Sequence, residues 1–395
     1  MHCRLVPTAG GTERTTLLLA EALHKRHDCE CVLVALQEGS EKFDCFSAQY
    51  DLIHQKSSRD KISFLHEIIA KYQIDICLIE SAFELPYLLN KARQQARRPI
   101  SILFVHHFAP GWERTVFPMT TYKKLKKSSG LIRFRYRMKL RIFPLFAWND
   151  IRKMKAKYKQ AYLNSDKIVL LSKQYIPSFV YLAGAKKLDK FTYIPNALSF
   201  DEFFDMSCYD EKQKIVVIVS RLEERQKRIL LALRLWKKIK QYAEAKDWKL
   251  FILGEGPHAT DLAWYCNYVQ SNQIPNVEFL GRVNSLPYYT NASIYMMTSS
   301  SEGLPMTLNE AHQNGVVPVV FNTFDALQDQ VTDGHDGYVV EEGDTQRYIE
   351  CVLRLMSDNK LRRTMAANGI SSSKQFTMDN IMERWLSLID AQASL

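Results

Sequence analysis

Short apolar runs that alternate with helical segments constrain the fold of this chain more than any other sequence feature. The apolar runs cover residues 31–36, 74–80, 100–105, 167–171, 215–219, 249–253, 277–280, 294–298, 317–321 and 338–340. Apolar side chains at helical spacing lie between them, for example in residues 12–26, 61–72 and 230–242. Strands separated by helices form parallel sheets, because a parallel crossover needs a dozen or more residues. We therefore predict an α/β fold of two successive doubly wound units.

A change in composition places the boundary between the two predicted units. Residues 201–213 are polar and acidic and show no clear periodicity, which is typical of a linker. We assign residues 1–200 to a first domain and residues 201–377 to a second. Residues 378–395 then form an amphipathic helix that can pack back on the first domain, with Ile381, Trp385, Leu386 and Ile389 on one face.

Cysteine usage and hydropathy indicate a cytoplasmic globular protein. The eight cysteines are scattered, none in a Cys-x-x-Cys pair, so we expect reduced thiols rather than disulfides or zinc ligands. No run approaches the roughly 20 apolar residues of a membrane span, and we expect no signal peptide.

Residues 299–311 combine a glycine-containing loop with the start of a helix. Gly303 allows backbone N–H groups to approach a ligand, and Pro305 suits the first position of a helix. The N–H groups at a helix start attract anions such as phosphate. Glu302 lies in the loop and Glu310 about one turn into the helix, where carboxylates accept hydrogen bonds from sugar hydroxyls. The alternative is an ordinary helix start followed by a surface glutamate.

Charged residues and glycines also follow other predicted strands. Arg221 and Lys227 come after the run at 215–219, and two cations at different positions suit a diphosphate. A solvated surface loop is the alternative for them. Gly254 and the pair Arg282 and Val283 end two further strands, where a nucleobase can lie against the backbone, although each is also consistent with a simple turn.

The glycine pair near the amino terminus has two interpretations. Gly10 and Gly11 stand between an apolar start and the helix at 12–26, which is the position of a phosphate loop or of a tight turn. They lack Gly-x-Gly-x-x-Gly spacing with a later acid, which disfavours a nicotinamide cofactor.

Taken together in this order, these motifs resemble the retaining GT-B glycosyltransferases of family 4, also called glycosyl transferases group 1. The resemblance spans nearly the whole chain and rests on Gly10 to Arg14, Ile194-Pro195-Asn196, Arg221 with Lys227, Gly254 to Pro257, Phe279-Leu280-Gly281, and Glu302 to Pro305 followed by Glu310. It implies two Rossmann-like domains that face a cleft, with the nucleotide sugar bound mainly by the second. Arg228 departs from the pattern, since family members often have glycine after the lysine, and it could alter the turn that aims Lys227.

The resemblance also implies roles for individual residues. Arg221, Lys227, Gly10 and Gly11 would bind the donor diphosphate, together with the backbone of Gly303, Leu304, Pro305 and Met306. Glu310, Gly254, Arg282 and Val283 would bind the nucleoside. Glu302 would hold the transferred sugar, and His107, or else His106, would face the sugar or the acceptor.

The reaction that the resemblance implies is transfer of a hexose with retained anomeric configuration. The donor would be a UDP- or GDP-linked sugar, the acceptor a glycan or a polyprenyl-linked glycan, and the product a surface polysaccharide. Cations and helix N–H groups at the departing diphosphate would stabilise the transition state. No Asp-x-Asp pair occurs in the chain, so we expect no metal and no other cofactor. The alternatives are a nucleotide-sugar epimerase of the same fold and a non-catalytic glycan- or lipid-binding protein.

A basic segment within residues 121–160 accounts for the net positive charge of the chain. Residues 123–159 contain 14 Lys and Arg against one acid, Asp150. The segment includes Lys123, Lys124, Lys126, Lys127, Arg133, Arg135 and Arg137, interleaved in part with aromatic residues. Cations with aromatics suit an anionic membrane surface, and no nucleic-acid module is recognisable. We therefore predict peripheral binding to the inner face of the cell membrane, with a merely solvated surface as the alternative.

Overall fold

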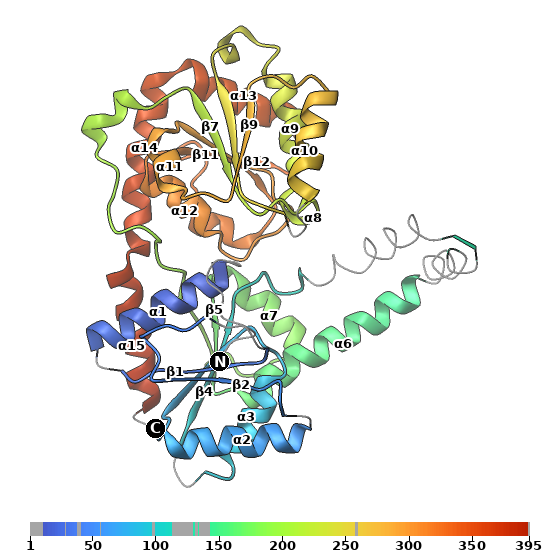
Figure 1. The fold of residues 1–395 in the computed structure, drawn as a ribbon, viewed down its shortest axis with the longest axis vertical. Coiled ribbons are helices and arrows are strands. Elements are labelled where there is room, and N and C mark those ends of the chain that lie inside the picture. The colour runs from blue at the N-terminus through green and yellow to red at the C-terminus, as the bar shows by residue number, and fades with distance from the viewer. Residues whose placement is uncertain are drawn as a thin grey trace. The chain divides into compact units, whose positions relative to one another are not determined.

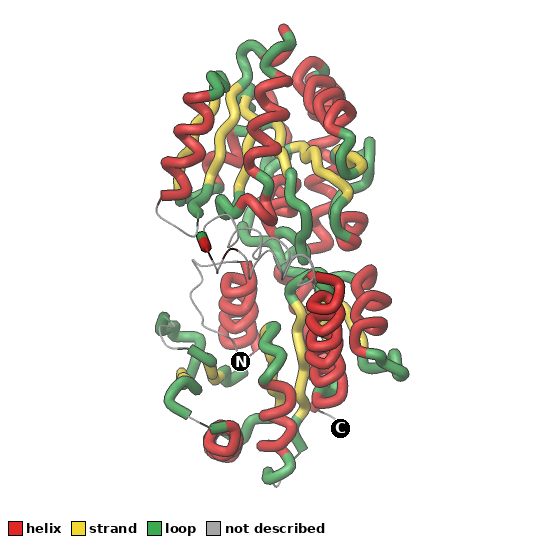
Figure 2. Tube along the Cα trace, turned by 90° about the vertical axis from the view of Figure 1, so that its right-hand side faces the viewer, coloured by secondary structure: helices red, strands yellow, loops and turns green. Residues whose placement is uncertain are grey.

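The chain forms two compact α/β units in the computed structural model, which describes residues 11–27, 29–37, 41–55, 57–96, 99–112, 129–130, 133, 143–256 and 260–393. The first unit comprises Met1–Pro195 with Met382–Leu395, and the second comprises Asn196–Ile381. In each unit the strands lie between helices (Figure 2). The α/β prediction is thereby confirmed. None of the helices in the described ranges is long and apolar enough to cross a membrane.

The first unit contains two parallel sheets. Its strands are β1 (Val32–Ala35), β2 (Ala48–Asp51), β3 (Ile76–Glu80), β4 (Ser101–His106), β5 (Lys167–Leu170) and β6 (Phe191–Tyr193). Strand β1 pairs with β2, and the other four are ordered β3-β4-β5-β6. The helices are α1 (Gly11–His27), α2 (Ser58–Lys71), α3 (Leu85–Arg93), α6 (Phe143–Asn164) and α7 (Ile176–Ala183). The sequence pattern missed β2, because Ala48–Asp51 has neither a run of apolar residues nor a buried face.

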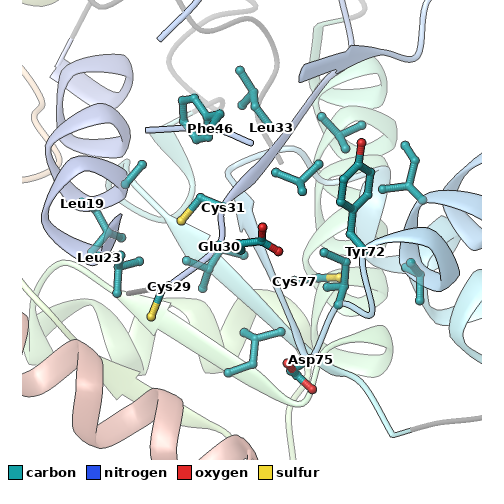
Figure 3. A pocket seen from close by; sticks show the side chains of 18 of the residues that line it. Leu19, Leu23, Cys29, Glu30, Cys31, Leu33, Phe46, Tyr72, Asp75 and Cys77 are labelled. Atoms are coloured by element: carbon teal, nitrogen blue, oxygen red, sulfur yellow. The ribbon is translucent and has the colours of Figure 1, made fainter. Parts of the chain in front are cut away.

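A cavity of about 460 Å³ lies beneath α1 in the first unit, bounded by β1, β3 and α2 (Figure 3). Its lining is mostly apolar and includes Cys29, Cys31 and Cys77. Burial raises the pKa of Cys31 and of Cys77 to about 11, so both remain protonated thiols at neutral pH. The seven cysteines that the structure describes are all free, as the scattered pattern predicts.

The second unit is a six-stranded parallel sheet ordered β12-β11-β10-β7-β8-β9. Its strands are β7 (Ile215–Val219), β8 (Lys249–Leu253), β9 (Val277–Gly281), β10 (Ile294–Met297), β11 (Val317–Asn322) and β12 (Tyr338–Glu341). The helices are α8 (Glu224–Lys227), α9 (Ile229–Ile239), α10 (Thr260–Ser271), α11 (Leu286–Asn291), α12 (Met306–Gln313), α13 (Thr345–Ser357) and α14 (Asn359–Ser373). They cover the sheet, with α9 packed beside α13 and α12 beside α14 (Figure 1).

The strand order of the second unit has its reversal point between β7 and β10. Successive strands β7, β8 and β9 run outward on one side, whereas β10, β11 and β12 run outward on the other. Open α/β sheets bind ligands in the crevice outside the carboxyl ends of the strands at such a point. The sheet is fixed by a continuous core in which Trp236, Trp248 and Tyr348 are almost fully buried.

Helix α15 (Met378–Ala393) begins in the second unit and continues into the first. In its first-unit part, Met382 and Trp385 are buried, and the carbonyl of Gln392 accepts a hydrogen bond of 3.2 Å from Ser101 Oγ. Residues 378–395 were expected to form a helix with one apolar face, and α15 buries Ile381 and Trp385 from that face. The first compact unit ends at Pro195, whereas the sequence pattern placed the boundary after residue 200.

Gly254 is required where β8 ends, because its backbone lies against the end of β7. Its φ is +136°, and a Cβ added there would lie 1.9 Å from the carbonyl oxygen of Ser220. The same approach allows Ser220 N–H to donate to Leu253 O at 2.9 Å, and Gly254 N–H to donate to Gly281 O at 2.7 Å. The ends of β7, β8 and β9 are thus joined by backbone hydrogen bonds.

We expect Gly254→Ala to destabilise the second unit by about 3 kcal/mol, since the clash is with backbone and cannot be relieved by a rotamer change. Gly334→Ala is the matched control: its φ is +74° but nothing lies within 4 Å of the added Cβ, and we expect a cost of about 1 kcal/mol. Differential scanning calorimetry of both variants measures this. Equal melting temperatures for the two variants would contradict the requirement for glycine at position 254.

Candidate functional site

The sequence motifs that follow β7 and β10 lie together at the reversal point of the second sheet. Lys227 ends α8, after β7, and Glu302 lies in the loop between β10 and α12. Lys227 Nζ donates to Glu302 Oε1 at 2.6 Å, and both side chains are mostly buried, with 14% and 7% of their surface exposed. Predicted roles for the diphosphate and for the sugar thus fall on two side chains that contact each other directly.

Both carboxylate oxygens of Glu302 have donors from the α8 segment. Gln226 Nε2 lies 3.3 Å from Glu302 Oε2 and also donates to Ser301 O at 2.9 Å. A buried carboxylate is stable only when a cation and hydrogen-bond donors compensate for its loss of water. The sequence analysis missed Gln226, because nothing in its spacing distinguishes it from its neighbours in residues 220–228.

Arg221 lies at the carboxyl end of β7 with its side chain exposed. Its carbonyl accepts a hydrogen bond of 2.8 Å from Glu223 N–H within the loop. Within the described ranges no hydrogen bond or ion pair of its guanidinium is found. Arg221 therefore presents a cation with five donors to solvent, from the segment between β7 and α8 that also leads to Lys227.

The start of α12 has no side-chain cap. Its N-cap residue is Pro305, which has no N–H and makes no side-chain capping bond. Side chains from two other segments bind carbonyl groups of this loop. Asn196 Nδ2 donates to Leu304 O at 3.2 Å, and Gln330 Nε2 donates to Pro305 O at 3.1 Å. Gly303, Leu304, Pro305 and Met306 thus form a supported loop at a helix start, as an anion site needs. Sequence reasoning also missed Gln330, which lies in a different segment.

The predicted nucleoside residues lie on neighbouring elements of the same sheet edge. Glu310 is in α12 and is 2% exposed. Gly254 follows β8, and Arg282 and Val283 follow β9 with exposed side chains. The structure therefore brings Gly254, Arg282 and Val283 to the end of the sheet that also carries Arg221.

His106 and His107 lie at the carboxyl end of β4 in the first unit, but in different surroundings. His107 Nε2 pairs with the carboxylate of Glu80, the last residue of β3, and His107 N–H donates to Ser81 Oγ at 2.9 Å. Both side chains of the pair are about 5% exposed. Glu80 was not predicted, although an acid at the end of an apolar strand run is a usable signal.

His106 is fully buried among aromatic rings. The centroids of Phe83, Tyr158 and Phe179 lie 5.5–5.6 Å from that of its imidazole. Because Tyr158 Oη accepts from Gly111 N–H at 2.9 Å, its own hydrogen can be donated to His106 Nε2 at 3.3 Å. Burial, and to a smaller extent His107, lowers the pKa of His106 to about 3. His106 is therefore a neutral core side chain at physiological pH.

Parts of the prediction lie outside the described residues. These are Gly10 and, in the basic segment, Lys123, Lys124, Lys126, Lys127, Arg135 and Arg137. Gly11 is the first residue of α1, and Arg133 is described with an exposed side chain. The later part of the basic segment lies on α6, where Arg152, Lys153, Lys157 and Lys159 are exposed and Lys155 Nζ lies 4.2 Å from the centroid of the Tyr181 ring.

Residues 199–372 match the family model "Glycosyl transferases group 1". The chain is 24% identical over 385 residues to a Campylobacter jejuni GalNAc-alpha-(1->4)-GalNAc-alpha-(1->3)-diNAcBac-PP-undecaprenol alpha-1,4-N-acetyl-D-galactosaminyltransferase, covering 96% of this chain and 95% of the relative. It is also 25% identical over 229 residues to the Erwinia amylovora amylovoran biosynthesis glycosyltransferase AmsD, with 57% and 62% covered.

Solved structures share the fold across nearly the whole chain. HepE from Anabaena, in complex with UDP, superposes with a TM-score of 0.71 at 14% identity, covering 99% of this chain and 98% of that one. The lipopolysaccharide outer core galactosyltransferase WaaB in its apo form gives a TM-score of 0.70 at 15% identity, with 99% and 98% covered. These are GT-B structures, and the predicted fold class is confirmed.

The low pKa of His106 makes stability depend on pH. The unfolded imidazole binds a proton below about pH 6.5 and the folded one only below about pH 3, so the unfolded state binds more protons between these values. We therefore expect the free energy of unfolding to fall as the pH is lowered from about 6.5, by up to about 1.4 kcal/mol per pH unit from this residue.

Urea denaturation between about pH 6.5 and pH 4.5 tests this, with His106→Phe losing less stability than the wild type across the range. His24→Gln is the control, because His24 is exposed on α1 and keeps its water in the folded state. Parallel stability–pH curves for wild type and His106→Phe would contradict the prediction.

Proposed function

We propose that this chain is a glycosyltransferase of the glycosyl transferases group 1 family, and that it transfers a hexose with retention from a nucleotide diphosphate sugar to a lipid-linked glycan. The observation that carries the proposal is the contact between Lys227 and Glu302 at the reversal point of the second sheet. A diphosphate and the sugar attached to it are adjacent in such a donor. The cation of Lys227 corresponds to the diphosphate, and the adjacent carboxylate of Glu302 corresponds to the sugar.

The diphosphate binds to cations and to N–H groups in this proposal. The exposed guanidinium of Arg221 gives bidentate hydrogen bonds, Lys227 adds a second charge, and the start of α12, which has no side-chain cap, attracts the anion. Negative charge grows on the diphosphate as the glycosidic bond breaks, so these groups bind the transition state more strongly than the ground state. They take the place that a metal ion has in other transferases, and we propose that no metal is needed.

The sugar binds to Glu302, which accepts hydrogen bonds from its hydroxyls. Glu310 binds the ribose, and Gly254, Arg282 and Val283 bind the base. In the first unit Glu80 pairs with His107, which we propose as the residue that contacts the sugar or the acceptor. The departing phosphate takes the acceptor proton on the face that the nucleotide leaves, so no side-chain nucleophile is required and the configuration is retained.

Two observations support the proposed acceptor class. The Campylobacter relative is named for transfer to an undecaprenyl-diphosphate-linked glycan, and α6 of this chain exposes Arg152, Lys153, Lys157 and Lys159 on one segment. Each cation near an anionic bilayer contributes about 1 kcal/mol to binding. We place the protein at the inner face of the cell membrane, where it extends a surface polysaccharide.

A screen of UDP-, GDP- and ADP-sugars by thermal shift, with and without EDTA, tests donor and metal together. We expect one nucleotide class to raise the melting temperature equally in both conditions. Arg221→Ala should weaken that donor about tenfold, because a charge-assisted hydrogen bond to phosphate is lost. Lys214→Ala is the matched control, since Lys214 is an exposed cation at the opposite, amino end of β7.

Three results would count against this scheme. Absence of a shift with every donor refutes nucleotide-sugar transfer, and a shift that EDTA abolishes refutes metal independence. Equal donor affinity in wild type and Arg221→Ala removes Arg221 from the diphosphate site.

Liposome sedimentation tests the membrane assignment. Binding should require anionic lipid and weaken with salt, because screening shortens the range of the α6 charges. Replacing Arg152, Lys153, Lys157 and Lys159 by Gln should reduce the bound fraction, with Lys237→Gln and Lys238→Gln on α9 as the control. Sedimentation that is indifferent to lipid charge and to salt would refute the assignment.

A further inference from the structure

Arg228 occupies a backbone conformation that favours glycine. It is the residue between α8 and α9, the C-cap of the first helix and the N-cap of the second, with φ 51° and ψ 47° in the left-handed region. A residue other than glycine is strained there, because its Cβ crowds the following carbonyl oxygen. The residue after Lys227 is therefore a left-handed arginine, in a conformation that glycine adopts without strain.

The guanidinium of Arg228 binds the segment that follows β10. Its Nε donates to Thr298 O at 2.7 Å and its Nη2 donates to Ser299 O at 2.9 Å. In return, Thr298 Oγ1 donates to Arg228 O at 3.1 Å and to Lys227 O at 3.0 Å. The remaining nitrogen, Nη1, pairs at 2.8 Å with Glu342, whose side chain is 57% exposed.

These bonds continue along the chain as far as Glu302. Ser300 N–H donates to Gln226 O at 2.7 Å, Gln226 Nε2 donates to Ser301 O at 2.9 Å, and Lys227 Nζ donates to Glu302 Oε1 at 2.6 Å. Each residue from Thr298 to Glu302 is therefore bonded to residues 225–228. The guanidinium of Arg228 binds the start of this segment and the ammonium of Lys227 binds its end at Glu302. Together they fix the position of the segment along α8.

We propose that Arg228 is a positioning residue, which sets the distance between the diphosphate cation Lys227 and the sugar carboxylate Glu302. The inference rests on the proposed function for the roles of those two side chains. Arg228 itself does not touch the donor in this scheme. It acts by holding Thr298 and Ser299 against the end of α8, so that Glu302 is presented to the sugar while Lys227 meets the phosphate. Small displacements of such groups reduce catalysis strongly without removing binding charge.

The structure supplies a variant that removes the guanidinium without straining the turn. Arg228→Gly suits the positive φ, so the backbone conformation is kept while both carbonyl bonds are lost. We expect kcat for transfer to fall about tenfold, the donor KM to change less than about twofold, and the melting temperature to stay within a few degrees of wild type. Arg228→Lys keeps the charge but cannot bond both carbonyls in the same plane, and it should restore kcat only in part.

Glu342→Gln is the matched control, because it removes the exposed ion pair and leaves both carbonyl bonds. Its kcat should equal that of the wild type. Hydrogen exchange of the Ser300 N–H gives a readout without any substrate, and this N–H should exchange at least tenfold faster in Arg228→Gly than in wild type and Glu342→Gln.

Each contrary result overturns the inference. Wild-type kcat in Arg228→Gly, a lowered melting temperature with unchanged kcat, or an equal loss in Glu342→Gln shows that the carbonyl bonds do not position Glu302. If the wild type itself transfers no sugar, the proposed function fails, while the exchange measurement still decides separately whether Arg228 holds this segment.

Discussion

The candidate site of the second unit is built around a mostly buried ion pair, that of Lys227 with Glu302. Two charges removed from water are stable only if their mutual attraction and further hydrogen bonds replace the lost hydration. Gln226 supplies a donor to the second carboxylate oxygen, and backbone and side-chain groups of residues 226–228 hold the segment from Thr298 to Ser301. The pair therefore joins the loops after β7 and β10, and the strand order places these loops at the reversal point of the sheet.

The strand order of this sheet accounts for the position of the candidate site. Parallel strands bring all their carboxyl ends to one edge, and only at the reversal point do two adjacent loops turn away from each other. Gly254 closes the adjoining edge, since only a residue without a Cβ lets β8 end against Ser220. The position of the candidate site is thus a consequence of backbone packing, and the loops at this edge of the sheet carry the charged side chains.

The two histidines of the first unit show how burial separates neighbours in sequence. His107 meets the carboxylate of Glu80 at the end of the next strand, whereas His106 points to Phe83, Tyr158 and Phe179. Adjacent residues at the end of a strand face opposite sides of the sheet, so one histidine can be polar and paired while the other is a neutral core residue. Residue type alone did not distinguish them.

Sequence alone determined the fold class and the loops that carry charge. The apolar run at 215–219 became β7 without a change of boundary, and Arg221, Lys227 and Glu302 follow strands where the pattern placed them. The short range of the hydrophobic pattern explains this success, because strands and helices are visible within a few residues. The contact of Lys227 with Glu302, 75 residues apart, the support from Gln226 and Gln330, and the pairing of Glu80 with His107 were decided only by tertiary structure. Arg228 is the sharpest case: sequence marked it as a departure from glycine, but only the folded chain provides the two carbonyls that its guanidinium binds.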